Sequence, residues 1–269
     1  MNLLTCILTE NDCYKANRTI TPKGVMVHST GADNPTLKRY VQPLAGDPDR
    51  AALLARLGTN IYQNDWNRAG TGACVHAFIG KLDDGSIATA QTLPWNWLGW
   101  HAGTGASGKS ANDTHISFEI CEDGLTDKTY FGQVYQEAVE LTAYLCRQYA
   151  LDPLEDGVVI CHQEGCQRGV ASNHADVLHW FPKMGKSMDD FRADVAAELA
   201  KMPEPEPGSE KENDMTYYKT LDEVPEYYRP TVEKLVDAGA LKGMGDNALY
   251  VSEEFCRVMT VLDRLGKLE

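Results

Sequence analysis

The sequence predicts an α/β fold in which a mixed central β-sheet is flanked by helices, followed by a small helical C-terminal module. Along residues 1–201, short β-branched runs alternate with segments whose apolar residues recur at helical spacing. Residues 202–214 alternate Pro, Glu, Ser and Gly without apolar periodicity, which is typical of an extended linker. We therefore expect one large domain over 1–201, a linker over 202–214 and a small module over 215–269.

The large domain contains several stretches with the composition of strands. They are Gly24–Thr30, Cys74–Ala90 (two strands joined at Asp83-Asp84-Gly85), Thr114–Glu122 and Gly157–Glu164. Helices are expected at Ala51–Leu57, 133–149 and Ser187–Leu199. In the middle one, Val134, Ala138, Leu141 and Leu145 share one face, so this helix should pack on the sheet.

The C-terminal module carries two helix signals. Pro230 opens the segment TVEKLVDAGAL, and Gly239 lies near its end. Ser252 has the position of an N-cap before a helix with Phe255, Val258, Met259 and Leu262 on one side. Such a tail could tether the large domain to a polymeric target, or could form a homo-oligomer.

Composition narrows the class of protein. The chain has 269 residues, is 43% hydrophobic and carries a formal net charge of −14, which disfavours binding to nucleic acid phosphates or to an anionic membrane surface. No apolar run approaches the roughly 20 residues of a membrane span. The N-terminal MNLLTCILTENDCYK is too short and too acidic for a signal peptide. We therefore expect synthesis in the cytoplasm and no membrane span, with the eight cysteines mostly reduced, a disulfide framework being the alternative.

The segment 103–110 matches the phosphate-binding loop G-x-x-x-x-G-K-S letter for letter. Such a loop works when it follows a buried strand and opens a helix, whose N-terminal amides hold the phosphate. Here the preceding LPWNWLGWHA is broken by Pro94 and Gly99, and the following SANDTHISFEIC runs into a strand. The context therefore disfavours nucleotide binding.

Several histidines lie where a metal site could form. His28 and His162 end two expected strands, and the alternation in CVHAF could direct His76 toward the same edge. His174, Asp176 and His179 follow His162 in the chain. A His/His/Asp zinc site is consistent with these residues, although each histidine could instead be a structural one.

The order of these motifs resembles the zinc-dependent N-acetylmuramoyl-L-alanine amidases of the type-2 amidase family, which includes phage endolysins and peptidoglycan recognition proteins. The resemblance covers roughly residues 20–182. It is carried, in family order, by MVHST, VHAFIGKLDDG, WHAG, ISFEI and CHQE, followed by an acidic residue before a Phe. It implies the fold of that family for 1–201 and the amide bond between N-acetylmuramic acid and L-alanine in bacterial peptidoglycan as the substrate.

The resemblance implies a Zn²⁺ ion held by His28, His162 and a third ligand. Asp176 matches the third position because it precedes Phe181 by five residues, as in the family. The chain departs from the family in having Val-Leu where Pro-Gly is common and a longer gap after His162. His174 and Cys166 therefore remain alternatives to Asp176 as the third ligand.

The resemblance also implies catalytic roles for Glu119 and His174. Zinc with three protein ligands leaves room for a water and lowers its pKa toward about 7. Glu119 would take the proton from that water and pass one to the leaving amine, and His174 would stabilise the oxyanion.

Four further residues, His76, His101, Trp66 and Trp100, would line the substrate cleft, with packing in the core or at the rim as the alternative. Residues 103–112 would form a lip of the groove.

The leading hypothesis is a phage or prophage endolysin, made in the host cytoplasm and acting on the wall after release, with 215–269 as a cell-wall-binding or dimerisation module. One alternative is a non-catalytic peptidoglycan-binding module on the same fold. Another is a Cys/His peptidase that uses Cys161-His162 or Cys74-x-His76, although residues one apart on a strand do not face each other.

Overall fold

The structure is a computed structural model that describes residues 1–202, 217–241, 249 and 251–268. The chain divides into two compact units, Met1–Pro203 and Glu204–Glu269. Apart from Met202, the expected linker over 202–214 lies outside the described residues.

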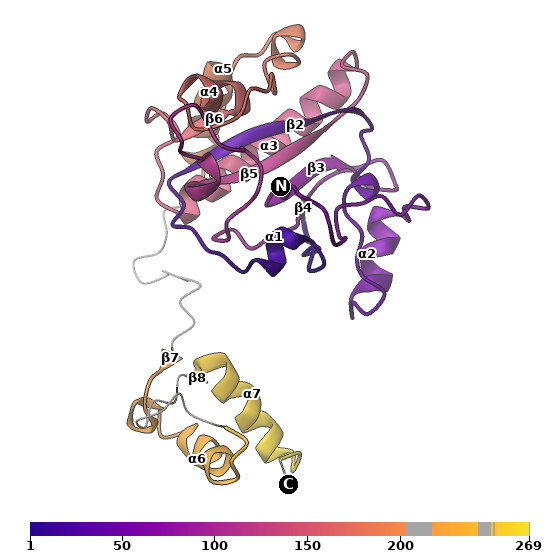
Figure 1. The fold of residues 1–269 in the computed structure, drawn as a ribbon. Coiled ribbons are helices and arrows are strands. Elements are labelled where there is room, and N and C mark those ends of the chain that lie inside the picture. Colours follow the sequence, from indigo (N-terminus) through magenta and orange to yellow (C-terminus); the bar gives the residue numbers. More distant parts are fainter. Residues whose placement is uncertain (203–216, 242–248, 250, 269) are drawn as a thin grey trace. The chain divides into compact units, whose positions relative to one another are not determined.

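The first unit is built on a mixed sheet of six strands (Figure 1). The strands are β1 (Leu3–Thr5), β2 (Gly24–Asp33), β3 (Ala77–Lys81), β4 (Ile87–Gln91), β5 (His115–Glu122) and β6 (Val159–Cys161). Their order is β1-β4-β3-β5-β2-β6, with β3 and β4 antiparallel and all other neighbours parallel. This confirms the expected mixed α/β fold.

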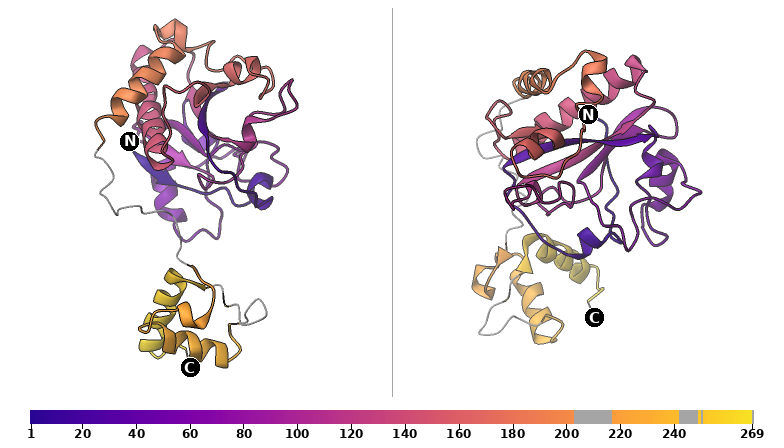
Figure 2. Two further views of the ribbon diagram at one scale, coloured as in Figure 1. Left: turned by 90° about the vertical axis from the view of Figure 1, so that its left-hand side faces the viewer. Right: turned by 45° about the horizontal axis from the view of Figure 1, so that its top comes forward.

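The helices of the first unit flank this sheet. They are α1 (Asp12–Lys15), α2 (Arg50–Leu57), α3 (Lys128–Gln148), α4 (His162–Gln167) and α5 (Met188–Leu199). The longest, α3, lies beside α5 (Figure 2). Asp127 caps α3 by accepting hydrogen bonds from two backbone amides, and Ser187 caps α5 in a capping box with Asp190.

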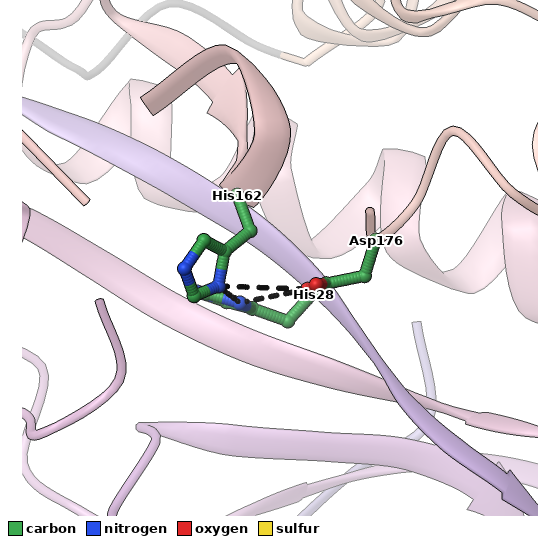
Figure 3. Close-up of side chains that lie close together, drawn as sticks. All are labelled: His28, His162 and Asp176. Atoms are coloured by element: carbon green, nitrogen blue, oxygen red, sulfur yellow. Dashed lines mark hydrogen bonds and ion pairs between the residues drawn. The ribbon is translucent and has the colours of Figure 1, made fainter. Parts of the chain in front are cut away.

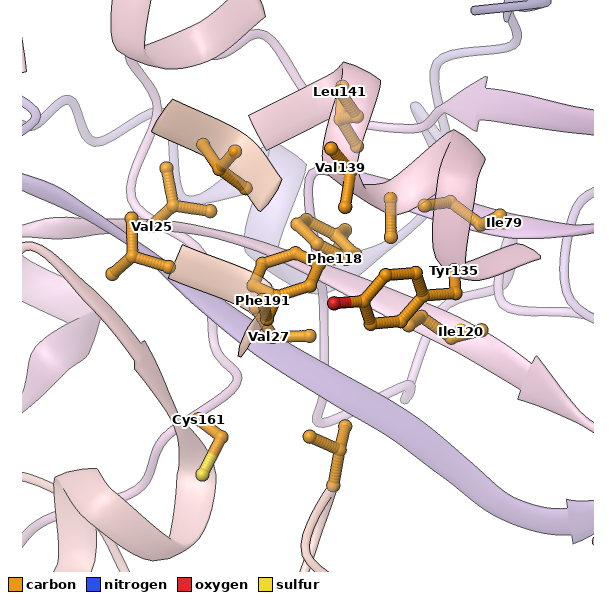
Figure 4. Close-up of a cluster of buried hydrophobic side chains, with 14 of the residues drawn as sticks. Val25, Val27, Ile79, Phe118, Ile120, Tyr135, Val139, Leu141, Cys161 and Phe191 are labelled. Atoms are coloured by element: carbon orange, nitrogen blue, oxygen red, sulfur yellow. The ribbon is translucent and has the colours of Figure 1, made fainter. Parts of the chain in front are cut away.

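Alternation along the strands separates the two faces of the sheet. In β2, Val25 and Val27 belong to the main core, which includes side chains of α3 and α5 (Figure 4). The residues between and after them, Met26 and His28, point to the opposite face, where Met26 packs with a smaller cluster. In β5, Phe118 joins the main core. The face opposite α3 and α5 is therefore the one that can carry a site.

Two local expectations need correction. The strand expected over Gly157–Glu164 is shorter, because β6 ends at Cys161 and His162 is the first residue of α4. The strand β1 was not expected, and it pairs in parallel with β4 at the edge of the sheet.

The second unit has its own small core. Its elements are β7 (Tyr217–Tyr218), α6 (Arg229–Asp237), β8 (Val251–Ser252) and α7 (Glu253–Arg264). Ser252 accepts a hydrogen bond from the backbone N–H of Phe255, as expected for an N-cap. Val258, expected on the same side of its helix as Phe255, is 48% exposed, whereas Cys256 is buried in the core. The antiparallel pair of β7 and β8 was not expected.

Among the described helices of both units, none has the length and apolar character that crossing a bilayer requires.

Candidate active site

Three side chains from distant parts of the chain converge on the face opposite α3 and α5 (Figure 3). Nδ1 of His28 lies 3.0 Å from Oδ2 of Asp176. Nδ1 of His162 lies 3.1 Å from Nδ1 of His28 and 3.8 Å from Oδ2 of Asp176. This group, which we call the His-His-Asp cluster, has all its donor atoms within 4.8 Å of one another.

Strand pairing explains why these residues meet. β2 and β6 are parallel neighbours in which Val27 is opposite Cys161, so the next residues, His28 and His162, come to the same place at the sheet edge. The loop after α4 returns to this place, where the backbone N–H of Gln163 donates to the carbonyl of Asp176 at 3.3 Å. The first two members of the cluster are therefore fixed by the sheet and the third by the loop.

The outer nitrogen of each ring has its own partner. Nε2 of His28 lies 3.0 Å from Nδ1 of His101, and Nε2 of His162 lies 3.2 Å from Oγ of Ser172. When each ring carries its proton on Nε2, both Nδ1 atoms present lone pairs toward the carboxylate of Asp176. Three lone pairs then face one another without a proton between them, an arrangement that suits a cation.

The charges of the cluster support this arrangement. Burial, and then the nearby His28, lower the pKa of His162 to about 4, so its ring is neutral at neutral pH. Burial opposes ionisation of Asp176, but contact with His28 and the nearby His162 outweigh it and lower the pKa of this carboxyl. Two imidazoles and one carboxylate are a donor set that can hold a metal ion.

Glu119 stands beside the cluster. It is the residue opposite His28 in the pairing of β2 with β5. Its Oε2 atom is buried and has no hydrogen-bond partner among the described residues. Burial, followed by the charges of Asp176 and Glu122, raises the pKa of Glu119 well above its usual value. A carboxyl group with a free oxygen and a raised pKa can both accept and donate a proton.

These groups line one pocket with a volume of about 360 Å³. Its lining residues are His28, Ser29, Thr30, Gly31, His101, Glu119, His162, His174, Ala175, Asp176 and His179. His101 is among these lining residues, and burial, followed by the neighbouring His28 and His76, lowers its pKa well below the usual value.

The candidates for the third ligand occupy different positions. Asp176 belongs to the His-His-Asp cluster. His174 is exposed at the pocket rim, its ring centroid 4.5 Å from that of His162 and its Nδ1 3.1 Å from Oγ of Ser172. The Cys166 thiol lies 3.9 Å from the side-chain oxygen of Asn173. The geometry thus groups Asp176, and neither His174 nor Cys166, with the two cluster histidines.

The expectation that His76 lines the cleft is wrong. Its side chain is 0% exposed. Its Nδ1 accepts a hydrogen bond of 3.0 Å from the backbone N–H of Ser117, and its Nε2 donates to the carbonyl of Trp97 at 2.8 Å. Burial lowers the pKa of His76 to about 4. His76 is therefore a structural histidine with both nitrogens in use.

The two tryptophans expected in the cleft also lie outside the pocket lining. Trp66 packs edge-on against Phe78, with ring centroids 5.0 Å apart. Trp100 packs against the cluster of Cys13, Cys74 and Leu93. Both tryptophans therefore pack among other apolar side chains and do not line the pocket, contrary to expectation.

The glycine-rich segment 103–110 does not line the pocket either. It docks on the segment after α4, where the backbone N–H of Ser107 donates to the carbonyl of Gly169 at 3.1 Å. A Cβ atom on Gly105 would lie 2.0 Å from that carbonyl oxygen. The glycine therefore permits close approach of two backbones, and the segment supports the loop that carries Ser172.

Sequence reasoning missed two polar residues of the site. Ser172 contacts His162, and His179 pairs with Glu122 at 2.9 Å at the pocket edge. His179 was noted only as one of several histidines after His162. Ser172 lies in the loop after α4 and matches no motif, so only the folded backbone reveals it.

Comparison with known proteins identifies a family. The family model described as N-acetylmuramoyl-L-alanine amidase matches residues 18–177, more than half of the 269 residues. The matched range contains His28, Glu119, His162 and Asp176. No curated protein matches the chain.

Similar solved structures include the hydrolase AmiA of Staphylococcus aureus in complex with its ligand, the PlyG catalytic domain and a mutant endolysin from Bacillus subtilis. AmiA is 18% identical, with 74% of this chain and 82% of that chain covered and a TM-score of 0.46. The PlyG domain is 19% identical, with coverage of 76% and 99% and a TM-score of 0.47. The endolysin is 23% identical, with coverage of 72% and 99% and a TM-score of 0.42.

Proposed function

Because the chain belongs to the N-acetylmuramoyl-L-alanine amidase family, we propose that it cleaves the amide between N-acetylmuramic acid and L-alanine with a Zn²⁺ ion held by His28, His162 and Asp176. The observation that carries the proposal is the convergence of two imidazole nitrogens and one carboxylate oxygen within 4.8 Å of one another. Imidazole nitrogen and carboxylate oxygen are typical zinc ligands, and three of them are typical of catalytic sites. When bound, zinc supplies Lewis acidity toward the amide carbonyl and an acidified water.

Glu119 serves as the proton carrier. Its unpartnered Oε2 is buried at the pocket, where it takes a proton from the attacking water and delivers one to the departing nitrogen of L-alanine. The raised pKa of this carboxyl allows it to hold the proton between the two steps.

His174 supports the developing negative charge. It is exposed at the rim of the pocket beside His162, so an N–H of its ring can donate to the oxyanion of the tetrahedral intermediate. Its contact with Ser172 holds the ring in place.

The buried state of the cysteines argues against a Cys/His peptidase. Cys161 and Cys74 are buried. Burial raises the pKa of Cys161 to about 11. The hydrogen bond with Cys13, followed by burial, raises that of Cys74 well above its usual value. A nucleophilic cysteine needs the opposite shift, because only the thiolate attacks.

The test of the proposed function is digestion of purified peptidoglycan. We expect new L-alanine N-termini and muramic acid residues with a free lactyl carboxylate, loss of activity in EDTA, recovery with Zn²⁺, and resistance to iodoacetamide. Release of reducing sugar ends without new L-alanine N-termini would contradict the proposal. So would full activity in EDTA together with loss of activity in iodoacetamide.

We further propose that the protein is an endolysin that reaches the wall from the cytoplasm after release, with the second unit (Glu204–Glu269) tethering it there or joining two copies. Expressed in a bacterial cytoplasm, the chain should lyse the culture only when the membrane is permeabilised. The unit Met1–Pro203 alone should cleave soluble muropeptides like the full chain but act more slowly on intact walls. Equal activity on walls, with both forms monomeric in sedimentation, would contradict the tethering and oligomer roles.

A further inference from the structure

We propose that His101 is a positioning residue that fixes the ring orientation and tautomer of His28, so that Nδ1 of His28 presents a lone pair to the His-His-Asp cluster. This inference rests on the proposed function only in naming zinc as the ion that benefits. The arrangement of protons follows from contacts within the chain.

A chain of hydrogen bonds leads from a backbone carbonyl to the cluster. Nε2 of His101 lies 3.3 Å from the carbonyl oxygen of His115. Nδ1 of His101 lies 3.0 Å from Nε2 of His28. The two rings are nearly perpendicular, with centroids 5.1 Å apart and an interplanar angle of 78°. Each ring therefore meets the other edge-on, through nitrogen atoms.

The carbonyl of His115 fixes which atom donates in each of these hydrogen bonds. A carbonyl oxygen only accepts, so the His101 proton must sit on Nε2. In the neutral ring, Nδ1 of His101 is then an acceptor, and Nε2 of His28 must be the donor. Nε2 of His28 consequently carries a proton, and in the neutral tautomer that zinc binding requires, Nδ1 presents its lone pair toward Asp176 and His162.

The backbone of His101 is itself held in place. The amides of His101 and Ala102 both donate to Oδ1 of Asn112, at 2.9 and 2.8 Å. The backbone N–H of Asn112 in turn donates to Oγ of Ser110 at 3.2 Å. Ser110, the last residue of the glycine-rich segment, thus holds Asn112, and Asn112 holds the backbone of His101.

The second cluster histidine has a weaker form of this device. The hydroxyl of Ser172 donates to the carbonyl of Ala102 at 3.1 Å, and its Oγ lies 3.2 Å from Nε2 of His162. A hydroxyl group can turn its proton to another acceptor, and Nδ1 of His174 lies 3.1 Å from the same Oγ. Ser172 therefore fixes the tautomer of His162 less firmly than His101 fixes that of His28. This contrast predicts that loss of His101 weakens zinc binding more than loss of Ser172.

The first part of the experiment compares three variants of His101. In His101→Asn, the side-chain oxygen stands near the former Nδ1 and can accept from His28. In His101→Gln, the matched polar control, the amide stands near the former Nε2 and leaves His28 without its acceptor. His101→Leu removes both contacts. Ser172→Ala is the comparison at the other cluster histidine.

Zinc affinity is measured by chelator competition with metal-free protein, and folding is checked by circular dichroism. We expect affinity to fall about 10- to 100-fold in His101→Leu and His101→Gln, with most of it restored in His101→Asn and a smaller loss in Ser172→Ala. Folded variants that bind zinc as the parent does, or an Asn variant no better than Gln, would overturn the proposal.

The second part reads the tautomer without zinc, which keeps the inference testable if a variant fails to fold. Long-range ¹H–¹⁵N NMR of the metal-free parent should show a proton on Nε2 of His28, and in His101→Asn the same. A His28 ring without a proton on Nε2 in the parent would overturn the proposal. Failure of the parent to bind zinc, with the expected tautomer present, would instead count against the proposed function.

Discussion

At His28 and His162, one ring nitrogen faces the shared cluster and the other faces a partner from a different loop. Asp176 is also held from two sides. Its backbone carbonyl accepts a hydrogen bond from the backbone N–H of Gln163, and its carboxylate faces the two imidazole rings. Orientation at each residue thus depends on neighbours far away in the sequence.

Substitution at the two candidates for the third ligand should give opposite results. Asp176→Ala removes one of three donor atoms in the cluster, so zinc content should be lost, with affinity falling by more than about 100-fold. His174→Ala leaves the cluster intact, so zinc should stay bound while kcat falls about 100-fold with the loss of an oxyanion donor. Metal analysis and steady-state kinetics on the same preparations check both. The reverse pattern would exchange the two roles.

Glu119→Gln should separate proton transfer from metal binding. The amide keeps the shape of the side chain but cannot carry the proton, so kcat should fall about 10²- to 10⁴-fold with zinc retained. In metal-free protein the variant should also become more stable relative to the parent as pH rises. Folding raises the pKa of Glu119 above its ordinary value of 4.5. Below that value the carboxyl is protonated in both the folded and the unfolded chain, and above it ionisation favours the unfolded parent. Urea unfolding of both proteins at pH 4 and pH 8 tests this, and an equal difference at the two values would contradict it.

Motifs reveal which residues react, but they do not reveal which way every side chain points. His28, Glu119 and His162 were found because each adjoins or lies in a recognisable strand, and parallel strands bring such positions together. His76 was misplaced because it precedes β3, where strand alternation does not apply. Its two hydrogen bonds come from Ser117 and Trp97, whose proximity is a property of the fold.

At the scale of elements, the candidate site is supported by the contact between two loops. The segment 103–110 lies on the segment after α4 through Gly105 and Gly169. The next residues hold Ala102 and Ser172 together, since the backbone N–H of Ser172 donates to the carbonyl of Ala102 at 2.8 Å. A sequence match to a phosphate-binding loop therefore marks a structural contact.

Gly105→Ala should disturb this contact, because the added Cβ would lie 2.0 Å from the carbonyl oxygen of Gly169. We expect a loss of about 1–3 kcal/mol in the free energy of unfolding, together with weaker zinc binding as Ser172 shifts. Gly72→Ala is the matched control, since a Cβ there meets no atom within 4 Å. Equal stability of the two variants in urea unfolding would show that the loops are not in close contact.

Element boundaries were predictable where local signals were strong. Ser187 caps α5 at the start of the expected range, and the antiparallel pair of β3 and β4 follows from the turn at Asp83-Asp84-Gly85. The start of α3 was predicted too late, at residue 133, because the cap at Asp127 was not recognised. β1 escaped prediction because a strand of three residues leaves no alternation to detect. β6 was predicted too long because its apolar run continues into the buried start of α4.

At the scale of the whole molecule, the first unit buries several histidines in neutral form. Burial lowers the pKa of His76 and of His162 to about 4, and it also lowers that of His115. Each of these rings gains a proton more easily in the unfolded chain than in the folded one, so together they make the fold sensitive to acid.

The resulting prediction concerns stability in acid, measured without zinc so that loss of metal does not contribute. His76 is 0% exposed, and its pKa falls from 6.5 to about 4 on folding. Above pH 6.5 both states are neutral and the full stability is present. As pH falls from 6.5 to 4 the unfolded chain binds the proton first, and stability declines by about 3 kcal/mol from this residue alone.

Urea unfolding at steps between pH 7.5 and 4.5 measures the slope. His76→Asn, whose side-chain oxygen can still accept from the backbone N–H of Ser117, carries no titrating ring and should show a shallower decline by up to about 1.4 kcal/mol per pH unit. The variant should be less stable than the parent at pH 7.5, because the bond to Trp97 is lost, and the difference should shrink toward pH 4.5. Parallel curves for the two proteins would mean that His76 takes up its proton equally well folded and unfolded, and the acid sensitivity would then have to come from other residues.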